Sequence, residues 1–158
     1  MSENFVDINN IAKRWNGQLG VEDISLNFAK GSFVALLGPS GCGKSTTLRL
    51  LSGLEQADQG TIKIDGVDVT DKPPSERNLS MVFQSYALFP HLTVKENVIF
   101  GLKVRKTPPK ERQEKLMRAL EITGLVGFEN RKPAELSGGQ RQRVALARAI
   151  VANQPLCL

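Results

Sequence analysis

Residues 38–45 constrain this chain more than any other part of its 158 residues. They read Gly-Pro-Ser-Gly-Cys-Gly-Lys-Ser and fit the pattern G-x-x-x-x-G-K-[ST]. The apolar run of residues 33–37 precedes them, and residues 44–52 follow with the apolar spacing of a helix. A buried strand, a glycine-rich turn and a helix start, in this order, are the context that the pattern requires. The pattern therefore predicts a loop that binds nucleotide phosphates rather than a fortuitous glycine-rich turn.

Each part of this phosphate loop has a chemical role toward an anion. Its glycines let the backbone curl so that N–H groups converge on phosphate oxygens, and the helix start adds the positive end of its dipole. Lys44 is expected to reach the β- and γ-phosphates, Ser45 to bind Mg²⁺ and Thr46 to donate near the α-phosphate. The predicted nucleotide-binding residues of the loop are Gly38, Pro39, Ser40, Gly41, Cys42, Gly43, Lys44, Ser45 and Thr46. Cys42 is either a small filler or, beside Lys44 and a helix N-terminus, a reactive thiol.

The apolar pattern of the rest of the chain predicts an α/β protein. Strands are expected within residues 1–30, where residues 24–28 alternate between apolar and polar, and over residues 61–65 before an Asp-Gly hairpin turn. Buried strands are expected over residues 33–37, over 79–83 and from residue 156 onward. Further helices are expected over residues 95–123, with a break at residues 107–109, and from about residue 138 to 152.

Composition excludes several classes of protein. Hydrophobic residues make up 41% and charged residues 23%, which is an ordinary globular balance. No apolar run approaches the roughly 20 residues of a membrane helix, and two cysteines cannot form a disulfide framework. The polar, acidic start is no secretory signal, so a reduced, cytoplasmic setting is expected. The net charge of +5 comes from basic residues interleaved with acidic ones, which indicates a solvated helix face, so no nucleic-acid partner is expected.

A second motif, Leu-Ser-Gly-Gly-Gln, occupies residues 136–140. Ser137 and Gln140 have the spacing of a helix capping box. The box does not explain Gly138 and Gly139, which cost helix stability but leave N–H groups bare for an anion. A phosphate loop followed by this motif resembles the nucleotide-binding subunit of ATP-binding-cassette (ABC) transporters.

The resemblance implies a P-loop NTPase (RecA-like) fold with an N-terminal antiparallel β part and a helical subdomain. It implies a β-rich part and ATP core over residues 1–84, a helical subdomain over 85–135, and the signature helix and the start of the Walker B strand over 136–158. In this family the signature residues, here Ser137, Gly138, Gly139 and Gln140, cover the γ-phosphate that the other subunit of a head-to-tail dimer holds.

Two further residues match functional positions of the family. Gln84 opens a segment that resembles the Q-loop, whose glutamine contacts Mg²⁺ near the attacking water, so Lys44 and Gln84 are the expected catalytic residues. Ser45 and Gln84 are then the expected Mg²⁺ ligands. Trp15 aligns with the aromatic residue that stacks on adenine. Trp15 could instead be a half-exposed aromatic residue of the surface. Gln84 could instead be a polar residue at the end of a strand.

The resemblance also implies partners. The Q-loop segment would contact transmembrane permease subunits, and an extracytoplasmic solute-binding protein would act indirectly. The sequences of the motifs are most similar to those of importer ATPases for maltose and glycerol-3-phosphate. Importers of polyamines, ferric iron and phosphonate have very similar ATPase subunits. The solute itself is not determined by the ATPase sequence.

One part of the family pattern is absent from these residues. The Asp-Glu pair that serves Mg²⁺ and the attacking water, and the switch histidine, are expected after Leu158, so the C-terminal part of the core is expected to be missing. His91 lies in the Q-loop segment and is not that histidine. Two alternatives stay open: an ABC ATPase that acts on DNA or the ribosome, and a protein that binds nucleotide without hydrolysing it.

Overall fold

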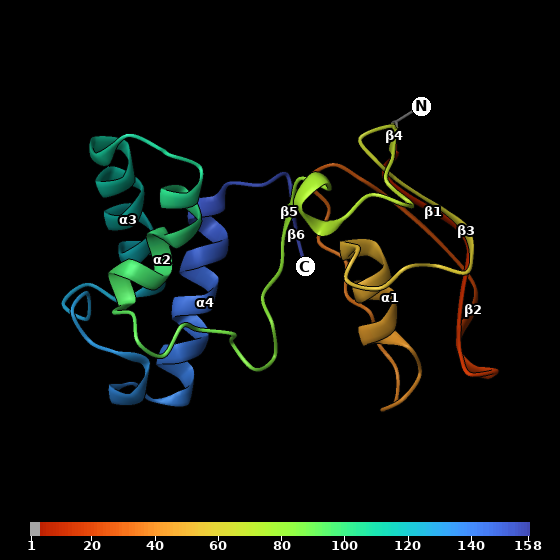
Figure 1. The fold of residues 1–158 in the computed structure, drawn as a ribbon, viewed down its shortest axis with the longest axis horizontal. Coiled ribbons are helices and arrows are strands. Elements are labelled where there is room, and N and C mark those ends of the chain that lie inside the picture. The colour runs from red at the N-terminus through yellow and green to blue at the C-terminus, as the bar shows by residue number, and fades with distance from the viewer. Residues whose placement is uncertain (1–3) are drawn as a thin grey trace. The chain divides into compact units, whose positions relative to one another are not determined.

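The computed structural model describes residues 4–158, which divide into two compact units (Figure 1). The first unit ends at Asn78 and the second runs from Leu79 to Leu158. Each unit has its own sheet and its own core, and the two are described separately here. The finer division at residues 84 and 135 stays a prediction.

The first unit is built on an antiparallel sheet with strand order β2-β1-β3-β4. Its strands are β1 (Asn4–Trp15), β2 (Gln18–Ala29), β3 (Gln59–Ile64) and β4 (Val67–Asp68). Apolar side chains of β1 and β3 form the buried face: Val6, Ile8, Ile11, Ile62 and Ile64. In β2, Ile24, Leu26 and Phe28 are half-buried while Ser25 and Asn27 are exposed. The predicted alternation of this strand is therefore confirmed.

Two tight turns join neighbouring strands of this sheet. The predicted Asp65-Gly66 turn joins β3 to β4 with φ angles of 51° and 74°. The turn at Asn16 and Gly17 joins β1 to β2 with φ angles of 48° and 80°. Positive φ at both central residues is the geometry of the two-residue hairpin, which Asn-Gly and Asp-Gly adopt most readily.

Helix α1 (Lys44–Ser52) has the predicted bounds and packs against β2. Leu50 and Leu51 are buried on its inner face. The helix ends at Gly53, which has a φ of 77°. Arg77, which follows the short helix η1 (Pro74–Glu76), is only 3% exposed and donates to the carbonyl oxygens of Leu50 and Leu51 at 2.7 and 3.1 Å. The C-terminal carbonyls of α1 are thus held by a side chain from a distant segment.

The prediction of a buried strand over residues 33–37 is wrong. Phe33 is 96% exposed and Leu37 is 90% exposed, and none of the described residues pairs with this run. An apolar sequence makes a segment suitable for the inside of a sheet, but burial requires neighbouring strands and covering layers. The described residues supply neither of these to residues 33–37.

The second unit contains a two-stranded parallel sheet of β5 (Leu79–Ser80) and β6 (Leu156–Cys157). Two further bonds continue the pairing: the Leu158 amide donates to the Ser80 carbonyl at 2.9 Å, and the Val82 amide donates to the Leu158 carbonyl at 2.8 Å. The strand expected over residues 79–83 is shorter than predicted and only half-buried, since β6 is its one partner among the described residues. The strand expected from residue 156 is present, and Leu156 is buried in it.

Three helices form the core of the second unit (Figure 1): α2 (Val94–Val104), α3 (Pro109–Thr123) and α4 (Gly138–Ala152). The short helix η2 (Pro133–Glu135) lies between α3 and α4 in the chain. The predicted break at residues 107–109 and the predicted bounds of the last helix are confirmed. The helices share a cluster of buried apolar side chains that includes Val98, Leu102, Leu116, Leu120 and Val144. None of the described helices is both long enough and apolar enough to cross a membrane.

Candidate nucleotide-binding site

The phosphate loop has a backbone that requires glycine. Gly38, Gly41 and Gly43 have φ angles of 153°, 83° and 92°. A Cβ on Gly43 would lie 2.5 Å from Cγ1 of Val21, which is closer than two carbon atoms can approach. Any other residue at position 43 would therefore be strained and would also clash with β2.

Lys44 places a positive charge inside this loop. Its ammonium donates to the carbonyl oxygens of Gly38 and Pro39, both at 2.7 Å, and lies 3.3 Å from the Cys42 sulfur. Cys42, Ser40 and Gly41 are exposed around it. The loop thus curls around the lysine of its own helix.

The N-terminal turn of α1 presents unused hydrogen-bond donors. No backbone carbonyl of the described residues accepts from the amides of Gly43, Lys44, Ser45 or Thr46. The first bond at this end runs from the Thr47 amide to the Gly43 carbonyl at 2.8 Å. The first turn holds no acidic side chain and its cap makes no side-chain hydrogen bond. Free amides, a helix dipole and an ammonium group together suit an anion.

Trp15 lies in the same unit and is brought toward the loop by β2. It is 40% exposed at the end of β1. A Cβ on Gly20 would lie 2.1 Å from Cζ3 of Trp15, so the indole lies directly against that glycine. The Gly20 carbonyl oxygen in turn lies 3.6 Å from the position of a Cβ on Gly43. Gly20 of β2 therefore lies against Trp15 on one side and near Gly43 of the phosphate loop on the other.

Gln84 lies in the second unit, exposed on a turn that follows β5. The Tyr86 amide closes this turn by donating to the Phe83 carbonyl at 2.9 Å. Arg148 of α4 donates to the carbonyl oxygens of Ala87 and Tyr86 at 2.7 and 3.1 Å. Burial lowers the pKa of the Arg148 guanidinium from its usual value.

Asn97 of α2 holds the continuation of this segment. It is fully buried, and its amide nitrogen donates to the carbonyl oxygens of Phe89, Leu92 and Thr93 at 3.0–3.1 Å. Its side-chain oxygen accepts from the Phe89 amide at 2.8 Å. One side chain thus satisfies four backbone groups of the segment.

The signature motif begins helix α4 as the sequence predicts. The Ser137 hydroxyl accepts from the Gln140 amide at 3.2 Å, and the Gln140 side chain accepts from the Ser137 amide at 2.7 Å. A Cβ on Gly139 would meet no atom within 4 Å, and one on Gly138 would lie 3.8 Å from the Tyr86 hydroxyl. The fold therefore places the turn after Gln84 next to the start of the signature helix.

Three supporting residues carry no signal in the sequence pattern: Arg77, Asn97 and Arg148. Each is a polar side chain that satisfies backbone carbonyls, most of them on another element. A lone arginine or asparagine in a helical or turn segment has no spacing that would distinguish it from a surface residue. Only the packing of the elements identifies these three.

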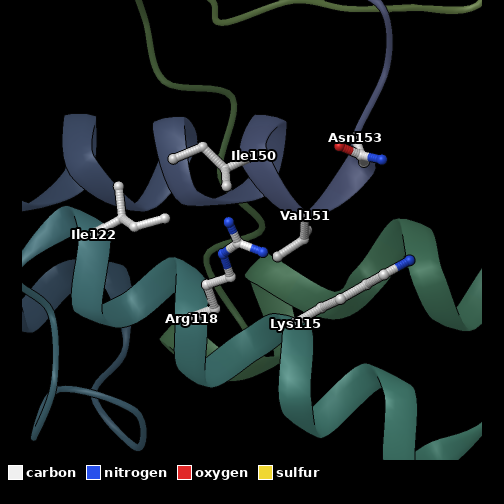
Figure 2. A pocket seen from close by; sticks show the side chains of 6 residues that line it. All are labelled: Lys115, Arg118, Ile122, Ile150, Val151 and Asn153. Atoms are coloured by element: carbon white, nitrogen blue, oxygen red, sulfur yellow. The ribbon is translucent and has the colours of Figure 1, made fainter.

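A basic pocket of the second unit is lined by none of the motif residues (Figure 2). Lys115 and Arg118 reach it from α3, while Ile150 and Val151 of α4 and the following Asn153 form its other wall. The Lys115 ammonium is paired with Glu111 one helical turn away, at 2.7 Å. None of the residues predicted to bind nucleotide lines this pocket.

The sequence profile described as "ABC transporter" matches residues 21–158. The chain belongs to the ABC transporter family. Among curated relatives, a spermidine/putrescine import ATP-binding protein, PotA of Clostridium novyi, is 48% identical over 158 residues, which are all of this chain and 45% of the relative. The Fe(3+) ions import ATP-binding protein FbpC of Photorhabdus laumondii is 48% identical over 99% of this chain and 44% of its own length. The putrescine transport ATP-binding protein PotG of Escherichia coli is 50% identical over 98% of this chain and 41% of its own length.

A solved structure has the same fold. It is a dimeric structure of a post-hydrolysis state of the ATP-binding cassette MJ0796 bound to ADP and Pi, with a TM-score of 0.86 and 34% identity over 96% of this chain and 72% of that one. The predicted family and the predicted P-loop NTPase fold with an antiparallel β part are thereby confirmed. The chain spans less than half the length of the curated relatives described above.

Proposed function

We propose that this chain is the ATP-binding part of an ABC importer subunit, which binds MgATP and, in the whole protein, hydrolyses ATP to drive solute uptake. The observation that carries the proposal is the phosphate loop, which holds the Lys44 ammonium and is followed by the free amides of residues 43–46. These donors suit the triphosphate, and Trp15 at the adjoining strand end suits the adenine ring.

Mg²⁺ fits the residues of this loop. The Ser45 hydroxyl is exposed in the first turn of α1 and makes no hydrogen bond with the described residues, so its oxygen is free for a hard cation. Phosphate oxygens and water would supply most of the other ligands, and Gln84 would supply one more. When bound, Mg²⁺ neutralises charge on the phosphates.

The catalytic roles follow from charge and position. Lys44 would leave the Gly38 and Pro39 carbonyls for the β- and γ-phosphates, where its charge stabilises the transferred group. Gln84 would orient the attacking water from its exposed turn. The signature residues Ser137, Gly138, Gly139 and Gln140 would cover the γ-phosphate bound by a second ATP-binding subunit. The open space around Gly139 and the dimeric structure of the similar cassette support that role.

A groove of the second unit supports a membrane partner. A cavity of about 220 Å³ is lined by Phe89 of the Q-loop segment, Phe100 and Arg105 of the α2 region, and Arg148 of α4. Aromatic walls with a cationic rim suit an amphipathic segment of a permease subunit. The subunit would then work on the cytoplasmic face of the membrane, and an extracytoplasmic solute-binding protein would deliver the solute. The relatives are named for polyamine and Fe(3+) import, so these are the first solutes to test.

Titration with MgATP tests the nucleotide site directly. Trp15 is the only tryptophan of the 158 residues, so its fluorescence reports both binding and the folding of the first unit. Lys44→Ala is expected to weaken MgATP binding about tenfold or more, because a hydrogen bond to a charged group is lost. Lys63→Ala, which removes a lysine of β3 instead, is the control and is expected to bind as the wild type does. Equal affinity of the Lys44→Ala variant and the wild type would refute the proposed site.

A further inference from the structure

Arg148 is tied to the turn after Gln84 in an unusual way. Its half-buried guanidinium donates to two consecutive carbonyl oxygens, those of Tyr86 and Ala87, from a position 61 and 62 residues away in sequence. No carboxylate of the described residues forms an ion pair with it. The backbone carbonyls are therefore the partners that stabilise this charge.

The two residues that Arg148 holds have strained backbones. Tyr86 has a φ of 62° and Ala87 a φ of 44°, so two successive residues with side chains lie in the left-handed region. Such conformations persist only where the surroundings hold them, and they concentrate at functional sites and switch regions. Arg148 is the side chain that binds the carbonyls of both.

The position of this turn connects three functional elements. Gln84 lies two residues before Tyr86, and the turn is closed by the bond from the Tyr86 amide to the Phe83 carbonyl. Arg148 belongs to α4, the helix that the signature motif begins. Arg148 also lines the cavity beside Phe89 and Phe100, so an occupant of that groove would contact the same guanidinium.

We propose that Arg148 is a positioning residue that holds the strained turn at Tyr86 and Ala87 and thereby fixes Gln84 relative to the signature helix. The role assigned to Gln84 rests on the proposed function, but the contact between Arg148 and the turn does not.

The turn can be observed by itself because Tyr86 is the only tyrosine of the 158 residues. With 3-fluorotyrosine incorporated, the chain gives one ¹⁹F resonance from this turn. Arg148→Gln is expected to move that resonance toward the position of free fluorotyrosine and to narrow it, because the turn is released. Arg143→Gln is the matched control, since Arg143 also extends from α4 to two backbone carbonyls, those of Thr123 and Gly124. It is expected to leave the resonance unchanged.

A strain-relieving substitution separates positioning from general stability. Glycine adopts positive φ without strain, so Ala87→Gly is expected to return the resonance of the Arg148→Gln variant toward its wild-type position. If Arg148→Gln does not fold by circular dichroism, Arg148→Lys is used with the same rescue. An unchanged resonance in a folded Arg148 variant would overturn the proposal. An equal shift in the Arg143→Gln variant, or no rescue by Ala87→Gly, would overturn it as well.

Activity in the transporter that contains this chain gives the second readout. Arg148→Lys is expected to lower kcat for ATP about tenfold with an unchanged KM, and Ala87→Gly is expected to recover most of the loss. A rise in KM with normal kcat would contradict a positioning role. If MgATP does not bind to the wild-type chain at all, the proposed function fails, while the ¹⁹F result still decides the role of Arg148 in the turn.

Discussion

Two helices of this chain, α1 and α4, begin at glycine-rich segments, and the glycines of the two segments differ in their conformation and surroundings. At the start of α1, the glycines have positive φ, and Gly43 leaves no room for a Cβ beside Val21. At the start of α4, Gly138 and Gly139 lie within the helix, and a Cβ on Gly139 would meet nothing within 4 Å. The first set of glycines is required by the chain's own fold. The second set is not, so the fold of this chain does not by itself account for these two glycines.

The two helix starts also differ in whether side chains accept hydrogen bonds from their backbone amides. The cap of α1 is Gly43, which offers no side chain, and the Lys44 ammonium lies inside the loop instead. The cap of α4 is Ser137, and its capping box satisfies two donors reciprocally. A helix start with free amides and a nearby cation holds an anion by itself. The start of α4 also has a cation beside it, because the Arg141 guanidinium donates to the Leu136 carbonyl at 2.8 Å. The two starts therefore differ in how many amides are free and not in the presence of a positive charge.

The largest expected effect concerns the glycine that the fold requires. Gly43→Ala is expected to destabilise the first unit by about 3 kcal/mol, because the left-handed strain and the clash with Val21 add together. Gly41→Ala has the strain without the clash, since a Cβ there meets nothing within 4 Å, and it is expected to lose about half as much. Urea unfolding followed by Trp15 fluorescence measures both variants. Equal losses would show that the contact with Val21 does not matter.

The thiols test whether the first start binds nucleotide by itself. With Cys157 replaced by serine, a maleimide on the exposed Cys42 would fill the phosphate loop and abolish MgATP binding. MgATP at ten times its dissociation constant is expected to slow this labelling about tenfold, since only free loop reacts. In the reverse variant, with Cys42 replaced, Cys157 is expected to react at the same rate with and without MgATP. An equal rate of Cys42 labelling with and without MgATP would contradict the proposed site.

The capping box predicts a moderate effect at the second start. Ser137→Ala removes the hydroxyl that accepts from the Gln140 amide and is expected to destabilise the second unit by about 1 kcal/mol. Ser137→Asn keeps a good cap and is expected to retain most of that stability. Thermal unfolding by circular dichroism compares the two. If both variants unfold alike, the cap does not hold this end of α4.

The smallest effect has the opposite sign. Gly139→Ala is expected to stabilise α4 by up to about 1 kcal/mol, because alanine is a better helix former and space is open for its methyl group. The proposed function predicts unchanged MgATP binding by the 158-residue chain and a lower ATP turnover in a complete importer. A destabilised variant would mean that Gly139 is required by the fold, as Gly43 is, and would remove the distinction between the two starts.

Local signals in the sequence determined much of the secondary structure. The phosphate loop and the apolar spacing after it gave the bounds of α1, and Ser137 with Gln140 marked the start of α4. The Asp65-Gly66 turn was predicted from two residues alone. These features are decided by backbone preferences within a few residues, so they do not depend on the rest of the molecule.

The tertiary structure alone decided which segments are buried and which polar side chains hold the site. Residues 33–37 have the apolar composition of an inner strand, yet they are exposed because no described strand pairs with them. Arg77, Asn97 and Arg148 became visible only through the carbonyls that they bind, at sequence separations of up to 62 residues. Burial and long-range hydrogen bonds are properties of pairs of segments brought together, so no pattern within one segment can specify them.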